Sequence, residues 1–435
     1  MTEAEGQVYR ESMMHELRDL GMVLDTPKLA ITPFVLSSDV YDELFVATRQ
    51  LLGLLKGAVT HAGASSGSRV AALGAEPDFY PLFADAAIED AYCDLMARPD
   101  LILTADGPKF LEFNVSGAFG GIPATHLMTR FWQRALTGVS SGSGRLFGHD
   151  PFEARAKCLM DVASELGTRP EVALLGTVRD VHGARSNRYY SLEAEQLKRH
   201  GVEAVHFEPE DLKRELELTD ELRYPLGIRY FTVPEWRGHG ISFEPIRAAE
   251  RAGWTLLPPQ TCGLLTNKKA LAWLSRGQSW MNSIDREVVE RYIPWTRLVR
   301  DEQVVWRGRR WPLVKLLREN REEFVIKKAT GMQGLQVTIG RYVAEQAWEA
   351  ELGDALTHDD AIVQEYVSAL PAPVYMGDGT PQGTHLAQTA PVLSPMVFGQ
   401  HAGGCWARFF PDGADGVVAV DAFGALESVA LTMRS

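Results

Sequence analysis

RPDLILTADGPKFLEFN, residues 98–114, holds two apolar runs on either side of the turn ADG. Both runs are strand-like, and successive side chains of a strand point to opposite faces. Gly107, at the end of the turn, can take the positive φ that a three-residue hairpin loop needs. The stretch therefore predicts a β-hairpin folded about Asp106.

Polar side chains gather on one face of this predicted hairpin. Folding sets Asp100 opposite Glu112. It also sets Arg98 opposite Asn114. Because side chains alternate between faces, all four project to one side. The other side is expected to be the core face, with Leu101, Leu103, Leu111 and Phe113.

Two carboxylates directly opposite each other repel unless a cation lies between them or one of them is protonated. With the amide oxygen of Asn114 they form an all-oxygen set, which suits magnesium. Arg98 beside them can hold a phosphate oxygen through its fork of donors. The alternative is a solvent-facing amphipathic hairpin whose arginine and aspartate form an ordinary surface pair.

The bulk composition limits the class of protein. A chain of 435 residues predicts two or three domains. The net charge of −13 argues against a broad surface for nucleic acid or an anionic membrane. The acidic start and the lack of any long apolar run predict a cytoplasmic protein. The four cysteines are far apart and are expected to be buried thiols.

The chain divides into three expected parts. Residues 1–150 hold the hairpin, which follows a stretch (79–100) that reads as a helix. Residues 151–262 contain the strand EVALL, a helix closed by a glycine and the strand VEAVHF, which predicts an open α/β domain. Residues 263–435 alternate apolar strands with helices. The expected fold class is therefore α/β with α+β lobes.

A phosphate-binding element is expected in the last part. No GxxxxGK[ST] motif occurs, and no GxGxxG follows the EVALL strand. FVIKKATGMQGLQVTIG, residues 324–340, instead places Lys327 and Lys328 on a strand before a glycine loop. Such a loop can close on phosphate while a strand lysine supplies positive charge. An ordinary hairpin is the alternative.

Together these motifs resemble the ATP-grasp ligases. NKKALAWL, FVIKKATGMQG and AIVQEYV are similar to the nucleotide-binding half of that fold, and RPD with LEFN is similar to its magnesium hairpin. The hairpin comes first here and last in the usual order. The chain therefore resembles the circularly permuted ATP-grasp proteins, including the synthetase part of glutathionylspermidine synthase and its bacterial relatives. The resemblance implies an inserted open α/β domain like the one that precedes the ATP-grasp fold.

The resemblance also implies roles for individual residues. Magnesium ligands would be Asp100, Glu112 and Asn114, and Arg98 would contact the transferred phosphoryl group with help from Arg408. Lys327 would contact phosphates, together with Lys268 or Lys269. The mobile lid would be Gly331, Met332, Gln333 and Gly334, and the linker over adenine would be Gln364, Glu365, Tyr366 and Val367. The loop with Ser116 and Gly117 would approach the acyl substrate.

The implied reaction is ATP-dependent ligation of a small-molecule carboxylate to an amine through an acyl phosphate, with ATP and magnesium as cofactors. Such a reaction needs no protein nucleophile. Arg185 and Asn187 precede a helix and either recognise a substrate carboxylate or cap that helix. A regulatory ATP-binding protein and a small-molecule kinase are the alternative functions.

Overall fold

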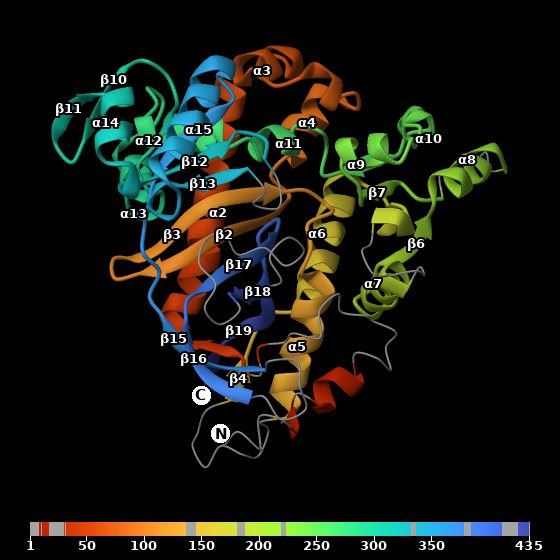
Figure 1. The fold of residues 1–435 in the computed structure, drawn as a ribbon. Coiled ribbons are helices and arrows are strands. Elements are labelled where there is room, and N and C mark those ends of the chain that lie inside the picture. The colour runs from red at the N-terminus through yellow and green to blue at the C-terminus, as the bar shows by residue number, and fades with distance from the viewer. Residues whose placement is uncertain are drawn as a thin grey trace.

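The computed structural model describes residues 8–9, 11–16, 30, 32–135, 145–180, 188–218, 223–331, 336–377, 384–410 and 425–434. Within them the chain has a mixed α/β fold built on one large mixed sheet and two four-stranded sheets (Figure 1). Among these residues no helix is both long enough and apolar enough to cross a membrane. The α/β class expected from the sequence is confirmed.

The large sheet joins the beginning of the chain to its end. Its main strands lie in the order β1 (Phe34–Leu36), β19 (Leu426–Arg434), β18 (His401–Phe409), β17 (Pro391–Phe398), β2 (Met96–Thr104) and β3 (Gly107–Val115). The short strand β4 (Arg145–Phe147) pairs with β19. All neighbours are antiparallel except β1 and β19. The β2–β3 hairpin therefore forms one edge of a sheet completed by the last strands of the chain.

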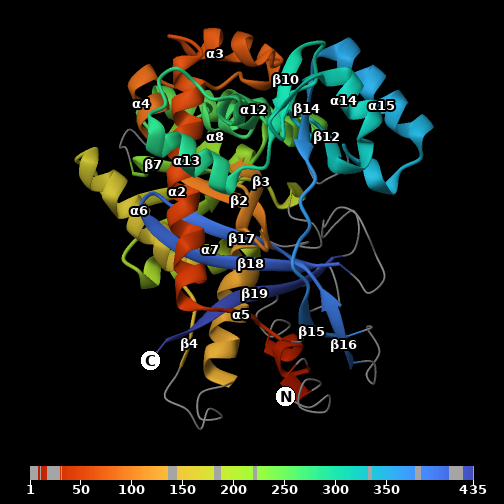
Figure 2. The ribbon, with the colours of Figure 1, turned by 90° about the vertical axis from the view of Figure 1, so that its left-hand side faces the viewer.

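Helices cover both faces of this sheet (Figure 2). Helix α2 (Ser38–His61) lies on one face, and α5 (Ile122–Ala135) and α6 (Pro151–Glu165) lie on the other. The side chain of Ser37 accepts a hydrogen bond from the Val40 amide and so begins α2. Apolar residues at helical spacing then face the sheet.

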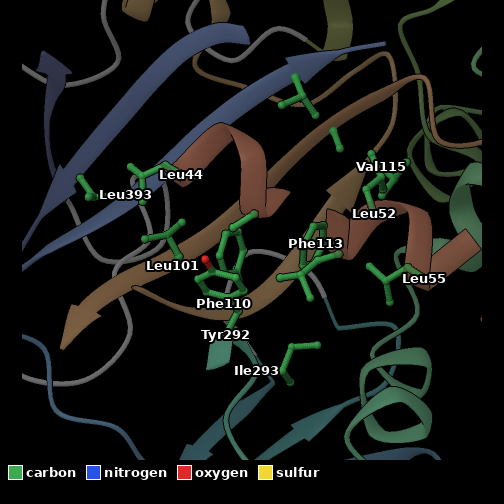
Figure 3. Close-up of a cluster of buried hydrophobic side chains, with 14 of the residues drawn as sticks. Leu44, Leu52, Leu55, Leu101, Phe110, Phe113, Val115, Tyr292, Ile293 and Leu393 are labelled. Atoms are coloured by element: carbon green, nitrogen blue, oxygen red, sulfur yellow. The ribbon is translucent and has the colours of Figure 1, made fainter. Parts of the chain in front are cut away.

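The core under α2 is an interlocked cluster of leucine and aromatic side chains. Figure 3 shows Leu44 of the helix beside Leu101 and Leu52 beside Phe113 and Val115. Burying side chains of this size contributes roughly 1.5–3 kcal/mol each. This packing fixes the apolar face of the hairpin and leaves its polar face turned away from the core.

The hairpin pairs as predicted, but one of its apolar side chains lies on the other face. Asp100 is opposite Glu112. The register then shifts, so that Leu101 is opposite Phe110 and Leu111 is the extra residue of a β-bulge. Phe110 enters the core in place of Leu111, which lines a cavity instead. The prediction that Leu111 faces the core was therefore wrong, because the bulge reverses the alternation at that point.

The loop of the hairpin is also shorter than predicted. Thr104 pairs with Gly107, so two residues rather than three connect the strands. Gly107 has a φ of 97°, the left-handed conformation predicted for it. The two-residue loop and the one-residue bulge offset each other, which explains why folding about Asp106 still gave the correct polar pairs.

The second sheet is parallel. Its strands lie in the order β6 (Glu203–Phe207), β5 (Glu171–Leu175), β7 (Leu226–Arg229) and β8 (Thr255–Leu257). Four further helices belong to this part: α7 (Arg188–Arg199), α8 (Pro209–Leu218), α9 (Val233–Gly238) and α10 (Glu244–Arg251). The predicted strand, helix and strand are β5, α7 and β6, with β5 and β6 parallel. The open α/β arrangement is confirmed for these elements.

The third sheet holds the lysine strand. Its order is β13 (Val337–Ile339), β12 (Phe324–Lys328), β14 (Ala361–Glu365) and β9 (Thr296–Leu298). Four helices lie in the same part of the chain: α12 (Lys269–Arg276), α13 (Ser283–Tyr292), α14 (Leu313–Glu319) and α15 (Glu345–His358). Two strand pairs complete the chain: β10 (Gln303–Trp306) with β11 (Arg309–Pro312), and β15 (Ala372–Gly377) with β16 (Thr384–Thr389).

Three short helices lie near the start of α12 or of the hairpin: α3 (Ser66–Leu73), α4 (Ala86–Tyr92) and α11 (Cys262–Leu265). The prediction of a helix over residues 79–100 was wrong outside α4. Pro81 interrupts it, and the Asp85 side chain accepts the Ala87 amide hydrogen bond that begins α4.

All four cysteines are free and buried, as expected.

Candidate functional site

One large cavity runs between the three sheets. Its volume is about 1170 Å³, above the roughly 300–1,000 Å³ of a typical single-ligand site. The polar face of the β2–β3 hairpin forms one wall, and β12, β13 and the residues after β14 form another. The carboxyl end of β7 and the strands β17 and β18 close the remainder. The cavity has room for a nucleotide and a second molecule.

Asp100 is held by cations and a hydroxyl. Its Oδ1 accepts hydrogen bonds from Ser394 Oγ at 2.7 Å and from Arg408 Nη2 at 2.7 Å, and Arg98 Nε lies 3.7 Å away. Burial alone would raise the pKa of Asp100, but the charges of Arg408 and Arg98 and these hydrogen bonds lower it to about 2. Asp100 is therefore a carboxylate at every physiological pH.

Two arginines lie side by side on an indole ring. The guanidinium carbons of Arg98 and Arg408 are 5.2 and 4.6 Å from the ring centroid of Trp406. Arg98 Nη1 donates to the carbonyl of Gly120 at 3.0 Å. The Nε atoms of both arginines are buried and have no hydrogen-bond partner among the described residues. Both arginines line the cavity.

Two lysines face the hairpin from the opposite wall. Lys268 Nζ lies 3.3 Å from Glu112 Oε2 and donates to the carbonyl of Gly331 at 2.6 Å. Lys327 Nζ donates to Gln364 Oε1 at 2.7 Å and to the carbonyl of Leu111 at 3.2 Å. The bulge that exposes Leu111 thus gives its carbonyl a partner on the lysine strand.

Lys327 is only 7% exposed. Burial lowers its pKa to about 8, assisted by the charge of Lys268 and opposed by the charges of Glu112 and Asp100. A lysine that titrates so near neutrality inside a cavity is typical of a functional site.

The neighbouring lysines point elsewhere. Lys269 Nζ donates to the carbonyl of Leu73 at 2.9 Å, which holds it against α3. Lys328 Nζ lies 2.8 Å from Asp360 and also contacts Asp354. Neither lysine lines the cavity. Of the two adjacent pairs, the structure brings Lys268 and Lys327 to the site.

The segment predicted to cover adenine borders the cavity. Gln364, Glu365, Tyr366 and Val367 all line it. The amides of Glu365 and Tyr366 already donate to the carbonyls of Trp295 and Glu323. The amide of Val367 donates to no described residue. Val367 is therefore the position at which a backbone amide of the linker can donate a hydrogen bond to a ligand.

The loop after the hairpin lies close to the parallel sheet. Ser116 and Gly117 line the cavity. A Cβ atom on Gly117 would lie 2.6 Å from the carbonyl oxygen of Arg229, so only glycine fits this approach. Arg155 Nη2 donates to the Gly117 carbonyl at 3.1 Å and fixes the loop from behind.

Five candidates fall outside the described residues: Arg185, Asn187, Met332, Gln333 and Gly334. Sequence reasoning missed three others that line the cavity or contact its carboxylate, namely Ser394, Trp406 and Arg229. Trp406 lies two residues before Arg408 on one strand, so alternation could have identified it. Arg229 ends a parallel strand, where ligands commonly bind in open α/β sheets.

The hairpin offers a set of oxygens suited to a hard cation. The contacts of Asp100 within the described residues all use Oδ1, and the ion pair of Glu112 uses Oε2. Asn114 uses its Nδ2 to donate to the Arg98 carbonyl. Asp100 Oδ2, Glu112 Oε1 and Asn114 Oδ1 thus have no partner among the described residues. Among the described residues no group of three His, Cys, Asp or Glu side chains could hold a metal, and the third oxygen of this set comes from an asparagine.

Comparisons with known proteins give a likeness of fold. No protein-family model and no curated protein matches the chain. A glutathione synthetase-like effector from Globodera pallida, solved in its apo form, has a similar structure with a TM-score of 0.61 and 12% sequence identity, over 99% of this chain and 97% of that one. A candidate gamma-glutamylcysteine synthetase from Methylobacillus flagellatus gives a TM-score of 0.37 and 11% identity, over 89% of this chain and 86% of that one. The first similarity spans almost the whole of both chains and shows that this chain shares the fold of that effector.

Proposed function

We propose that this protein is an ATP-dependent ligase that joins a carboxylic acid to an amine and releases ADP and phosphate. One observation carries the proposal: a single cavity places the carboxylate and amide face of the hairpin opposite Lys268 and Lys327. The glutathione synthetase-like fold supports it. The fold would be an ATP-grasp in circularly permuted order, akin to the synthetase part of glutathionylspermidine synthase.

The nucleotide would lie along β12 and β14. Lys268 and Lys327 would contact its phosphates, because both ammonium groups face the cavity and the glycine loop begins beside Lys268. The adenine would lie under residues 364–367, among the apolar side chains of Val325 and Ile339. The amide of Val367 would donate a hydrogen bond to the base.

Magnesium fits the hairpin, since Asp100, Glu112 and Asn114 each present on one face an oxygen that has no partner among the described residues. Bound there, magnesium would neutralise phosphate charge and fix the triphosphate for in-line transfer. Glu112 would then exchange its contact with Lys268 for the metal, which frees the Lys268 ammonium for phosphate. Asp100 would remain ionised throughout because its pKa is about 2.

Arg98 and Arg408 would stabilise the transferred group. A carboxylate oxygen of the substrate attacks the γ-phosphorus, the bond to the ADP oxygen breaks, and an acyl phosphate forms. The two guanidinium groups, which belong to residues that line the cavity, would offset the charge that develops on the phosphoryl oxygens. An amine then attacks the acyl carbon, and inorganic phosphate leaves as the amine loses its proton. No protein nucleophile takes part.

The experiment measures ADP release from ATP and magnesium with pools of carboxylic acids, in the presence of amines or of hydroxylamine. Hydroxylamine converts an acyl phosphate to a hydroxamate, which is detected directly. Glu112→Ala and Lys327→Ala should abolish both products. Lys328→Ala is the matched control and should retain them, because Lys328 points away to Asp354 and Asp360.

The outcomes separate the three functions. ADP with amide or hydroxamate, lost in both variants, supports a ligase. ADP with a stable phosphorylated product and no amide would instead indicate a kinase. Nucleotide binding without ADP release against any pool would contradict the ligase and favour a regulatory ATP-binding protein.

A further inference from the structure

Trp406 is a buried tryptophan beside the two arginines of the proposed reaction centre. It lies on β18, opposite Ser394 of β17 and two residues before Arg408. Residues two apart on a strand share a face, so the indole and the Arg408 side chain lie on the same side of the sheet. Trp406 is 6% exposed and lines the cavity. The indole therefore belongs to the wall of the cavity that carries the arginines.

The backbone after the hairpin leaves room for this indole. Gly121 has a φ of 91°, and a Cβ atom on it would lie 2.7 Å from two ring carbons of Trp406. A larger residue at this position would therefore displace the ring. The carbonyl of the preceding residue, Gly120, accepts the hydrogen bond from Arg98 at 3.0 Å. One short segment thus touches the indole and holds one of the two arginines.

Arg98 and Arg408 are like charges buried close together. Burial lowers the pKa of Arg98, the charge of Asp100 opposes this effect, and the charge of Arg408 adds to it. Among the described residues both arginines pair with the same carboxylate. Asp100 Oδ1 lies 2.7 Å from Arg408 Nη2 and 3.7 Å from Arg98 Nε. One negative charge therefore faces two positive ones, and Asp100 is also a proposed magnesium ligand.

The indole can hold both arginines without neutralising them. Their guanidinium carbons lie 5.2 Å (Arg98) and 4.6 Å (Arg408) from the ring centroid of Trp406. Both distances are within the roughly 6 Å at which the quadrupole of an aromatic ring attracts a cation, and tryptophan gives the strongest attraction of this kind. A second carboxylate would cancel a positive charge and occupy guanidinium donors. The face of an indole has no net charge, so the arginines keep theirs for an anion in the cavity.

We propose that Trp406 is a positioning residue of the ligase, whose ring holds Arg98 and Arg408 side by side for the transferred phosphoryl group. This inference rests on the proposed ligase function and adds a residue to its machinery. Trp406 acts through the two arginines and does not touch the reacting atoms. The rate should therefore respond to the charge distribution of the ring as well as to its shape.

The test introduces tryptophan analogues with one, two or three fluorine atoms on the benzo ring at position 406 alone, in the full chain. Fluorine withdraws π density from the ring face and weakens its attraction for cations, while the ring stays close to its natural size. The assay is hydroxamate formation from ATP, magnesium, hydroxylamine and an acid that the wild type uses. With each added fluorine kcat should fall, by about tenfold across the series.

Nucleotide affinity is the second readout. The two arginines would act on charge that develops in the transition state. The dissociation constant of a magnesium complex of a non-hydrolysable ATP analogue should therefore change by less than about threefold across the series. Among ordinary substitutions, Trp406→Phe should retain more activity than Trp406→Leu, because a phenyl ring keeps part of the attraction.

Trp311 is the matched control. The guanidinium carbon of Arg309 lies 4.3 Å from its ring centroid, which is the same kind of contact, but neither residue lines the cavity. The same fluorinated analogues at position 311 should leave kcat unchanged.

The outcomes separate this inference from the proposed function. A flat fluorine series at position 406 in an active enzyme would overturn the inference, and a loss seen only in Trp406→Leu would assign Trp406 to packing. An equal fall in kcat and in nucleotide affinity would also overturn it. Absence of hydroxamate with every acid in the wild type would instead overturn the proposed ligase function, and with it the role of Trp406 in that reaction.

Discussion

If Lys327 contacts the phosphates as proposed, its low pKa should make nucleotide binding depend on pH. With a pKa of about 8, Lys327 is protonated at pH 7 and mostly neutral at pH 9.5. In the proposed complex the phosphates would return its pKa to at least the ordinary value of about 10.4. The protein must then take up a proton to bind ATP at high pH. The dissociation constant should therefore rise with pH above 8.

The magnitude follows from the two pKa values. For a single linked proton, the dissociation constant rises up to about tenfold for each pH unit between them, or about 30-fold from pH 7 to pH 9.5. The assay is calorimetric titration of wild-type protein with a magnesium complex of a non-hydrolysable ATP analogue at half-unit steps of pH. Proton uptake should appear as a dependence of the heat on the ionisation enthalpy of the buffer.

Lys327→Arg is the decisive control. Arginine stays protonated throughout this range, so its dissociation constant should be nearly flat with pH even if the affinity is lower. A wild-type dissociation constant that changed less than about threefold would refute the depressed pKa. A Lys327→Arg variant as steep as the wild type would assign the titration to another group.

Three further predictions test the hairpin and its surroundings. Phe110→Ala should lower the free energy of unfolding by about 3–5 kcal/mol and Leu111→Ala by less than about 1 kcal/mol, because the bulge puts only Phe110 in the core; equal losses in urea denaturation would contradict that register. Glu112→Gln should raise the free magnesium needed for half-maximal ADP formation by about tenfold or more, whereas Glu235→Gln, which keeps its capping of α9, should not. Gly117→Ala should weaken acyl-donor binding and leave nucleotide affinity intact, since its Cβ would strike Arg229 and Ile228 rather than the nucleotide wall; a parallel loss of both in calorimetry would show that the loop supports the whole site.

The polar pairs of the hairpin were predictable because they need only a turn and a period of two. The bulge was not. Residues 110 and 111 are both large and apolar, and either could face the core. Packing partners place Phe110, rather than Leu111, in the core. The ring of Phe110 packs against those of Phe113 and Tyr292 at centroid distances of 5.6 and 6.0 Å. Tyr292 lies about 180 residues further along the chain, beyond the reach of local periodicity.

The lysine pairs show the same limit. Alternation on β12 predicts that only one of Lys327 and Lys328 faces inward, but the choice depends on what lies on each side. Asp354 and Asp360 hold Lys328 outside, and Gln364 holds Lys327 inside. These partners come from α15, β14 and the segment between them, so the chain must fold before the inner lysine is defined.

The position of Arg229 at the end of a strand could be predicted from the sequence, but its lack of an ion-pair partner could not. The end of a parallel strand marks a ligand edge, and the sequence already indicated that sheet. The lack of a counterion among the described residues is a property of the assembled structure, because Glu250 feels the charge of Arg229 without forming an ion pair with it. A sequence shows that an arginine is present, whereas only its surroundings show that its charge is unpaired.

The balance of charge around the hairpin connects the proposed metal and nucleotide sites. Two carboxylates, Asp100 and Glu112, face four basic side chains: Arg98, Arg408, Lys268 and Lys327. Within the chain itself, these cations relieve the repulsion that two opposed carboxylates would otherwise have. A triphosphate entering alone would compete with Glu112 for Lys268, and a magnesium ion entering alone would meet four nearby positive charges. In the proposed complex each ligand would remove the obstacle to the other, because magnesium would bind the carboxylates while phosphate would bind the cations. Metal and nucleotide should therefore bind this cavity as a mutually dependent pair, although the chain as a whole carries a net charge of −13.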